Sequence, residues 1–513
     1  MINVRLGVGC TMEFRRVFLA FLLAAALTLS SCSGLPQQGG GPVGGMTTLS
    51  LTMQADLLPN AVLPNAPPTG TSILSLKVTV LGVTLTPTSG NQVTLDLGTP
   101  SPVIELTRLQ SDSSVLGTFS VTSGTYTSMT VVFASPDIVF LNQSGGTVTG
   151  TLSTCVDGAI CEAQPPAAGA VQINFSPSLS LSANGQQGLR LAFNINNALN
   201  STSTSIGMNF TPASLTVLSA ATLPRTGTPS GALDLVEDFT GVVTSVTPST
   251  RSVTVTSATR GTLTAVAPAS FVLDDPFSVC TTTTPDFSCV KLNQVVSVDA
   301  MLNPDGTFTL QELEPLAATA DDFIEGVVAT VQDATHFQIV TTEKVTAPST
   351  LLSSLSVGDP VSVTISAATN PFRVDTKGIT VPANSFAGGT TTSVIFPGQT
   401  VSMHVTGFTA AAAGTFAAAT IDGATLRFSR FTGTVAPPVT SPNFRITALP
   451  PMFALGNSSL PDPAQVQGTL NKTNYDGVAD GTGLADGDTA ATRALYLPPG
   501  ASATFATAKV RKH

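Results

Sequence analysis

Histidines and adjacent carboxylates are the first residues of this 513-residue chain that could do chemistry. The three histidines are His336, His404 and His513, and none has a second histidine at a metal-binding spacing. A lone histidine within a strand pattern is typical of a surface or edge position. Carboxylates are adjacent at Asp274-Asp275 and Asp321-Asp322. These segments have loop-like surroundings, so we expect their charges to be solvated.

Sequence motifs for catalysis are lacking. The chain has no Gly-x-Ser-x-Gly nucleophile turn, no P-loop and no dinucleotide-binding glycine motif after a strand. It also has no tryptophan and only three tyrosines to stack against a sugar ring. We therefore expect no catalytic residues and no cofactor. A hydrolase with an unrecognised carboxylate site remains an alternative, because glycosidases need only two suitably placed carboxylates.

One acidic segment resembles part of a calcium-binding loop. On the EF-hand pattern, Asn474, Asp476 and Asp480 fall at ligand positions. Lys472 occupies the first ligand position and Gly483 the last, which removes the negative charge that makes such loops bind tightly. The sequence therefore favours a hairpin tip rich in Asp and Gly over a metal site, with weak calcium binding as the alternative.

Four cysteines form two closely spaced pairs. Cys155 and Cys161 are separated by five residues, and Cys280 and Cys289 by eight. In an oxidising compartment each pair would form a disulfide. A zinc site with four thiolates is the alternative, but it favours two-residue gaps within each pair.

The N-terminus has the pattern of a secretory signal peptide spanning residues 1–31. Arg15 and Arg16 precede an apolar run of thirteen residues, Val17–Leu29, in which only Thr28 is polar. Small residues follow at Ser30-Ser31. The run is shorter than the roughly 20 residues that span a bilayer, which argues against a permanent transmembrane helix. An ordinary secretory cleavage that leaves Cys32 free is a further alternative.

Leu29-Ser30-Ser31-Cys32 resembles the lipobox of bacterial lipoproteins. That resemblance implies cleavage before Cys32, a diacylglycerol on its thiol and a palmitate-type acyl chain on the new amino group. Two or three chains anchor a protein stably to a membrane. Ser33, rather than Asp, follows the cysteine, which by the same resemblance favours the outer membrane of the cell envelope. Residues 32–46 would form a flexible tether rich in Gly and Pro.

Composition limits the partners of the mature chain. Only 10% of residues are charged, against 42% hydrophobic. Removal of residues 1–31 leaves 18 basic and 30 acidic residues, a net charge of −12. The single basic run is the C-terminal Lys509–His513, which we expect to be a solvated chain end. Nucleic acid is therefore not a predicted partner. The membrane is a predicted partner, through the lipid on Cys32. A glycan or another envelope protein is a further candidate partner.

Period-2 alternation predicts an all-β chain whose first folded domain spans residues 47–222. Leu74, Leu76, Val78 and Val80 show the alternation, and Ser89–Asn91, Asp305-Gly306 and Asp422-Gly423 are expected turns. The Val103–Leu109 strand and the Gly124-Thr125-Tyr126 turn resemble an uncharacterised domain of surface lipoproteins. The turn is also similar to that of transthyretin-like sandwiches. The resemblance implies a transthyretin-like or immunoglobulin-like sandwich with the Tyr126 ring pointing inward. Asn194 stands where that family often has Asp.

The remainder holds three copies of one unit, in modules 223–318, 319–430 and 431–513. Phe239-Thr-Gly241, Phe323-Ile-Glu-Gly326 and Phe431-Thr-Gly433 open the copies. Thr307–Leu310, Thr415–Ala418 and Thr504–Thr507 close them. The middle copy also resembles a second uncharacterised lipoprotein domain through Leu355–Val363. Each copy has room for five or six strands, which fits a small barrel of the oligonucleotide/oligosaccharide-binding (OB) type. An immunoglobulin-like sandwich is the alternative. The glycine near each opening phenylalanine would let the first strand bend.

The sequence thus predicts a non-catalytic, lipid-anchored envelope protein with a structural or ligand-binding role. A carbohydrate-binding or adhesion protein and a hydrolase are the alternatives.

Overall fold

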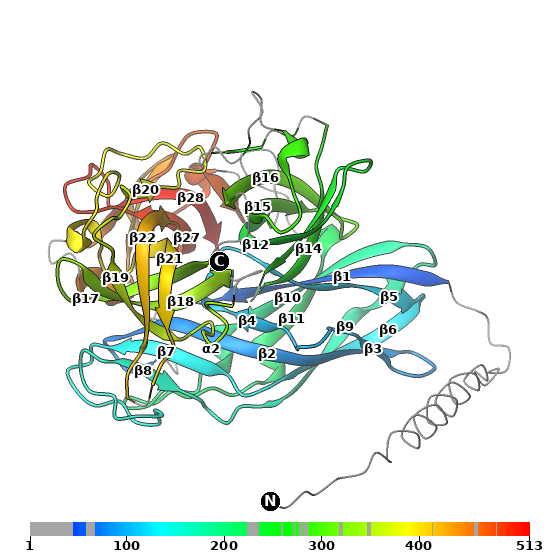
Figure 1. Ribbon diagram of the computed structural model, residues 1–513. Coiled ribbons are helices and arrows are strands. Elements are labelled where there is room, and N and C mark those ends of the chain that lie inside the picture. Colours follow the sequence, from blue (N-terminus) through cyan, green and yellow to red (C-terminus); the bar gives the residue numbers. More distant parts are fainter. Residues whose placement is uncertain are drawn as a thin grey trace, which may run out of the picture. The chain divides into compact units, whose positions relative to one another are not determined.

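Strands make up nearly all of the secondary structure, as the alternating sequence predicts (Figure 1). The structure is a computed structural model. It describes residues 45–57, 67–222, 235–257, 260–269, 271, 273–275, 280, 286–317, 322–345, 350–412, 414–455, 460–478 and 480–513. The predicted signal peptide, Cys32 and Asp321 lie outside the described residues. Residues 45–513 form one compact unit. No helix among the described residues is long and apolar enough to cross a membrane.

The first part of the chain is a two-sheet sandwich. One sheet has the order β11-β10-β1-β5, and the other has the order β8-β7-β2-β6-β9, with β3 and β4 added to β2. The first comprises β1 (Met46–Asp56), β5 (Ser114–Thr122), β10 (Gln186–Asn194) and β11 (Leu215–Ser219). The second comprises β2 (Thr71–Pro87), β3 (Val93–Leu95), β4 (Val103–Glu105), β6 (Gly124–Phe133), β7 (Asp137–Asn142), β8 (Ile160–Ala163) and β9 (Gly169–Leu181). Both sheets bury their inner faces in one hydrophobic core. Tyr126 lies in that core, so its inward orientation is confirmed.

Three five-stranded rings follow, and they share one connectivity. Barrel 1 comprises β12 (Leu235–Thr247), β13 (Ser252–Ser257), β14 (Gly261–Val266), β15 (Val295–Leu302) and β16 (Phe308–Ala317). Barrel 2 comprises β17 (Phe323–Val331), β18 (His336–Val345), β19 (Pro360–Ile365), β21 (Thr400–Thr409) and β22 (Ala417–Arg427). Barrel 3 comprises β23 (Ser429–Thr440), β24 (Asn443–Thr447), β25 (Ala464–Gln467), β27 (Thr489–Tyr496) and β28 (Phe505–Lys512). The short strands β20 (Arg373–Val374) and β26 (Asn474–Asp476) add to barrels 2 and 3.

In each ring the spatial order is first, second, third, fifth and fourth strand. A parallel pairing of the third with the fifth strand closes it, by β14 with β16, β19 with β22, and β25 with β28. A small Greek-key barrel of this kind is what the repeat predicts. The all-β fold, with a sandwich followed by three barrel-like modules, is therefore confirmed.

The repeated sequence elements mark the same places in every barrel. The opening phenylalanines lie in the first strands, β12, β17 and β23, and the closing segments lead into the fifth strands, β16, β22 and β28. The opening glycine lies where the second strand passes closest. A Cβ atom on Gly241 would lie 2.4 Å from the carbonyl oxygen of Thr256, and one on Gly326 or Gly433 would lie 2.7 Å from the equivalent oxygen. The repeat therefore encodes a close approach of two backbones.

Two local expectations need correction or refinement. Asp422-Gly423 is not a turn, because both residues lie inside β22. The register between β21 and β22 shifts there, with His404 opposite Gly423 and Val405 opposite Ile421, so Asp422 is the extra residue of a β-bulge. The only α-helices in the described part of the chain are the short α2 (Ile195–Ala198) and α3 (Met452–Leu455). Asn194 caps α2 by accepting a hydrogen bond from the Asn197 backbone N–H at 2.9 Å.

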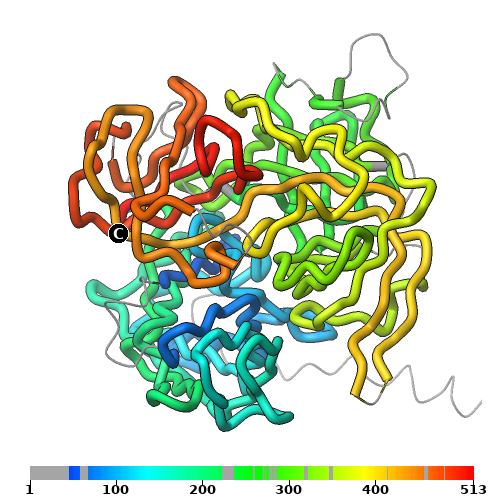
Figure 2. The backbone as a smooth tube through the Cα atoms, turned by 90° about the vertical axis from the view of Figure 1, so that its left-hand side faces the viewer, coloured from blue at the N-terminus to red at the C-terminus, as the bar shows by residue number. Residues whose placement is uncertain are grey.

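The hydrophobic cores cross the boundaries between the barrels and the sandwich. The core of barrel 2 includes Leu495 and Leu497 from barrel 3. A second core joins Leu74 of the sandwich, Val340 of barrel 2 and Phe431 of barrel 3. Figure 2 traces the chain through these neighbouring parts, from blue to red. Because apolar surface is buried between the modules as well as within them, they do not form a string of separate domains.

Candidate functional site

A continuous network of buried ion pairs lies where the four parts of the fold meet. We call it the central charge cluster. Its members are Arg108 and Asp112 of the sandwich; Glu237, Asp238, Arg260, Glu312 and Glu314 of barrel 1; Glu325, Glu343, Asp375, Lys377 and Arg427 of barrel 2; and Arg430, Arg493 and Lys509 of barrel 3. Every side chain except that of Glu312 is at most 6% exposed.

Ion pairs within the cluster run from one module to the next. Arg108 of the sandwich lies 2.9 Å from Glu325 and 3.0 Å from Glu343, both in barrel 2. Arg427 continues the network from barrel 2 to Glu314 of barrel 1 at 3.4 Å. Removal of one partner from a buried pair typically costs 3–5 kcal/mol, so the cluster fixes how the modules pack.

Asp238 is the point on which cations from two barrels converge. Its carboxylate lies 2.5 Å from Arg493, 3.2 Å from Arg430 and 3.9 Å from Lys377. The backbone at Asp238 has a φ of +46° and lies at a register shift between Val236 and Phe239. A bulge re-aims a side chain in this way, here into the cluster.

Arg260 joins barrel 1 to the sandwich. Its guanidinium lies 2.7 Å from Asp112 and donates to the carbonyl oxygens of Glu237, Asp238 and Ser113 at 2.6, 2.9 and 2.7 Å. The guanidinium carbon also lies 5.2 Å from the centre of the Phe239 ring. The opening phenylalanine of the first repeat is therefore also part of the wall of the charge cluster.

Burial and charge shift the pKa values of the cluster in opposite directions. Burial alone would raise the pKa of Asp238, but Arg493 and the other cations hold it well below its usual range. For Glu312, burial outweighs Lys377 and raises the pKa to about 7. Burial likewise raises the pKa of Asp375 to about 6 against the opposing effect of Arg427. The cluster contains one more carboxylate than cation. One carboxyl group can therefore keep its proton in mildly acidic solution without leaving a cation unpaired.

The basic C-terminus is not a solvated chain end. It forms β28, in which the side chain of Lys509 is 1% exposed and lies 3.7 Å from Glu237. Arg511 is also buried and lies 3.1 Å from Asp56. The prediction failed because strand pairing with β27 gives the tail a buried face, and its cations meet carboxylates from other modules.

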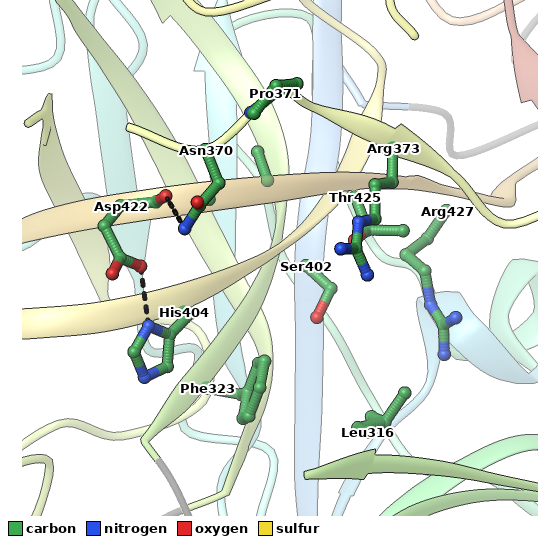
Figure 3. Close-up of a pocket in the computed structure, with 12 residues that line it drawn as sticks. Leu316, Phe323, Asn370, Pro371, Arg373, Ser402, His404, Asp422, Thr425 and Arg427 are labelled. Carbon is green, nitrogen blue, oxygen red and sulfur yellow. Dashed lines mark hydrogen bonds and ion pairs between the residues drawn. The ribbon is translucent and has the colours of Figure 1, made fainter. Parts of the chain in front are cut away.

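A hollow of about 310 Å³ opens beside the cluster on the outer face of barrel 2 (Figure 3). Its floor is the outward face of β17, β21, β22 and β20. One row across these strands holds Phe323, His404 and Gly423. The next row holds Glu325, Ser402, Thr425 and Arg373. Leu316 of barrel 1 forms part of the wall, so the hollow lies where the two barrels meet.

A histidine–carboxylate pair lies at one end of the hollow. His404 Nδ1 lies 2.6 Å from Asp422 Oδ1, and both side chains are about one-third exposed. The bulge in β22 places Asp422 there, and the Asn370 amide donates to the Asp422 carbonyl oxygen at 3.2 Å. The His404 and Phe323 rings lie 5.5 Å apart. Figure 3 shows Arg373 and Arg427 toward the opposite end.

Each of the three histidines lies beside a carboxylate, a neighbour that the sequence does not predict. His336 pairs with Asp333 at 2.8 Å on an exposed turn, and His513 lies 3.7 Å from Asp56 with its side chain only 11% exposed. The sequence shows only that His336 follows an aspartate by three residues. The carboxylates near His404 and His513 come from other strands, and no short sequence spacing predicts these pairs.

The predicted acidic sites are dispersed. Asn474 and Asp476 lie in β26, paired with β28, and Asp476 lies 3.5 Å from Arg511. Asp480 instead accepts a hydrogen bond from Thr482 N–H at 2.8 Å. Among the described residues, no group of three acidic, histidine or cysteine side chains could hold a metal. Asp274 is exposed, as expected of a loop, whereas Asp322 is buried at 9% exposure.

Both predicted cysteine pairs form disulfides. Cys155 bonds to Cys161 and Cys280 bonds to Cys289, with Cα atoms 5.6 Å apart in each pair. The zinc alternative is therefore wrong, because each sulfur is already bonded to its neighbour in the sequence pair.

The fold defines a class of protein in which a β-sandwich packs against three OB-type barrels. Buried ion pairs of the central charge cluster connect these parts. No model of a known protein family, no curated protein and no solved structure matches this chain. The resemblances of its motifs to lipoprotein domains therefore stay predictions.

Proposed function

We propose that the chain is a lipid-anchored protein of the bacterial cell envelope, in the outer membrane, whose folded unit has a non-catalytic structural or ligand-binding role. The signal-peptide pattern that ends at Cys32 supports the localisation in the cell envelope. The observation that supports the role is the central charge cluster, to which all four parts of the fold contribute buried charges. Such a cluster favours one fixed arrangement of modules over hinged ones.

The anchor is tested by mass. The full chain is expressed in a bacterial host, extracted from membranes and measured intact, beside a Cys32→Ser variant. We expect the wild-type mass to match a chain starting at Cys32 with added acyl groups, and the variant to lack them. An unprocessed leader, or a mature chain without acyl mass, would contradict the proposal.

A carbohydrate-binding role is the second candidate. The hollow on barrel 2 favours it, because an aromatic ring, a carboxylate, an amide and a guanidinium line one small depression. Ligand sites commonly combine apolar walls with a few such polar groups. Glycan-array binding by the full chain tests this role, and failure to bind any glycan would contradict it.

A further inference from the structure

The hollow on barrel 2 lies away from the surface by which small barrels of this type usually bind ligands. That surface is the face of the second and third strands, here β18 and β19. The hollow instead lies on β17, β21, β22 and β20, beside Leu316 of barrel 1. Barrel 1 therefore contributes one wall residue to a depression that is otherwise lined by barrel 2.

The polar groups of the hollow can both donate and accept hydrogen bonds. The Asp422 carboxylate accepts, and its Oδ1 already holds His404 Nδ1 at 2.6 Å. Ser402 and Thr425, opposite each other on β21 and β22, offer hydroxyl groups. The guanidinium of Arg373 has several N–H donors in a fixed fork, so it can hold a ligand oxygen alongside another partner.

One wall of the hollow is apolar. Phe323 and His404 lie opposite each other on β17 and β21, with ring planes inclined at 53°. Pro371 and Leu316 extend the apolar surface. A ligand with hydroxyl groups at its edge and C–H groups on its face would match both the polar groups and this wall.

The charged side chains beneath the floor of the hollow disfavour an anionic ligand. Arg427, a member of the central charge cluster, also lines the hollow, but it pairs with Glu314 at 3.4 Å, with Glu325 at 3.6 Å and with Asp375. Lys377, beyond it, is held by Glu312 at 3.1 Å and by Glu314 at 3.2 Å. Carboxylates thus outnumber these two cations, and at the rim the charge of Asp422 offsets that of Arg373. A second anion would meet net negative charge at close range.

We propose that the hollow lined by Phe323, His404, Asp422 and Arg373 binds one neutral sugar unit of a glycan. This inference rests on the second candidate function, carbohydrate binding, and names the class of ligand and the site. In it, Asp422 and Arg373 bind the sugar hydroxyls, and Phe323 packs against the C–H face of the ring.

Saturation-transfer NMR on the full chain in detergent tests the site. The probes are the methyl glycosides of glucose, galactose and mannose, with glucuronate as the anionic counterpart. We expect at least one neutral glycoside to bind, and to bind more tightly than glucuronate. Asp422→Asn should weaken binding about tenfold, because the acceptor of the sugar hydroxyl loses its charge. Arg373→Gln, an exposed position whose change spares the core, should weaken it in the same direction.

The matched control is Asp333→Asn, which alters the other exposed histidine–carboxylate pair of barrel 2, outside the hollow. It should leave the affinity unchanged. The proposal fails if none of the three neutral glycosides binds, if glucuronate binds best, or if Asp333→Asn weakens binding as much as Asp422→Asn. If the chain binds a glycan on the array but Asp422→Asn and Arg373→Gln bind as the wild type does, this inference fails and the second candidate function stands. None of these outcomes affects the acyl mass of the mature chain.

Discussion

Asp238 of barrel 1 and Arg493 of barrel 3, 255 positions apart in the sequence, form a buried ion pair with Oδ2 and Nη2 2.5 Å apart. The Arg493 guanidinium also reaches Glu237 at 2.8 Å and lies 4.4 Å from the centre of the Phe428 ring. One arginine thus connects the first strand of barrel 1, the fourth strand of barrel 3 and the segment that leads out of barrel 2. The modules are coupled through such residues rather than through their linkers.

Substitution of Asp238 should destabilise the whole unit. Asp238→Asn leaves Arg493, Arg430 and Lys377 with less negative charge in a buried setting, and we expect a loss of roughly 3–5 kcal/mol. Calorimetry should show one transition at lower temperature, because the cluster joins all modules. Asp305→Asn, on an exposed turn, should cost less than about 1 kcal/mol. Separate early melting of barrel 1 alone would argue against coupling.

The two lysines of the C-terminal strand should differ sharply. Lys509 is buried beside Glu237, whereas Lys512 pairs with Asp488 at 2.7 Å and its side chain is 30% exposed. Lys509→Met should lower the free energy of unfolding by about 3 kcal/mol. Lys512→Met should lower it by less than about 1 kcal/mol, because exposed pairs contribute little. Denaturant titration measures both, and equal losses would mean that the tail is not anchored as described.

The strands and barrels could be predicted because their signals are local. The alternation of Leu76, Val78 and Val80 and the spacing of the phenylalanine and closing motifs both survive in the fold, whereas a register shift puts Leu74 in a second core. The charge cluster could not be predicted in this way. Glu312 and Glu314 alternate along β16 just as solvated residues would, and only the packing of another barrel against that face buries them.

The His404–Asp422 pair could not be predicted from the sequence for a different reason. Asp-Gly is a strong turn signal, and here pairing with β21 overrides it and turns the aspartate into a bulge residue. A bulge depends on the partner strand, so a single sequence carries no clear mark of it. The cysteine pairs, by contrast, were predictable because each ring is closed within a few residues.

Glu312 and Asp375 should make stability fall as the pH rises from about 5 to 8. The lowered pKa of His513, about 4, acts in the opposite direction below about pH 6.5. The folded-state pKa values of Glu312 and Asp375, about 7 and about 6, lie above the ordinary 4.5 and 3.8, so these groups favour folding while protonated. Their contribution is full at low pH and is lost as the pH rises through 6 to 7. Asp238 and Glu314 have lowered pKa values, so their contribution is present above the ordinary values and lost in acid.

Glu312→Gln separates these effects, because the amide imitates the protonated carboxyl group. The difference in melting temperature between pH 5 and pH 8 should be smaller in this variant than in the wild type, at constant ionic strength. Asp305→Asn again serves as the control and should keep the wild-type difference. A Glu312→Gln variant that keeps the full wild-type difference would refute the assignment of a raised pKa to Glu312.

The opening glycine of each barrel should resist even a methyl group. In barrel 1, a Cβ atom on Gly241 would lie 2.4 Å from the carbonyl oxygen of Thr256 and 2.9 Å from a methyl carbon of Val255, so β12 and β13 would have to separate. Overpacking of this kind costs roughly 1–3 kcal/mol. Gly82, in β2, has open space at the same atom, so Gly82→Ala is the matched control and should be neutral or slightly stabilising. Thermal unfolding of the two variants compares them directly. If Gly241→Ala melts with the wild type while Gly82→Ala does not, then the close approach of these strands is not what the repeated glycine serves.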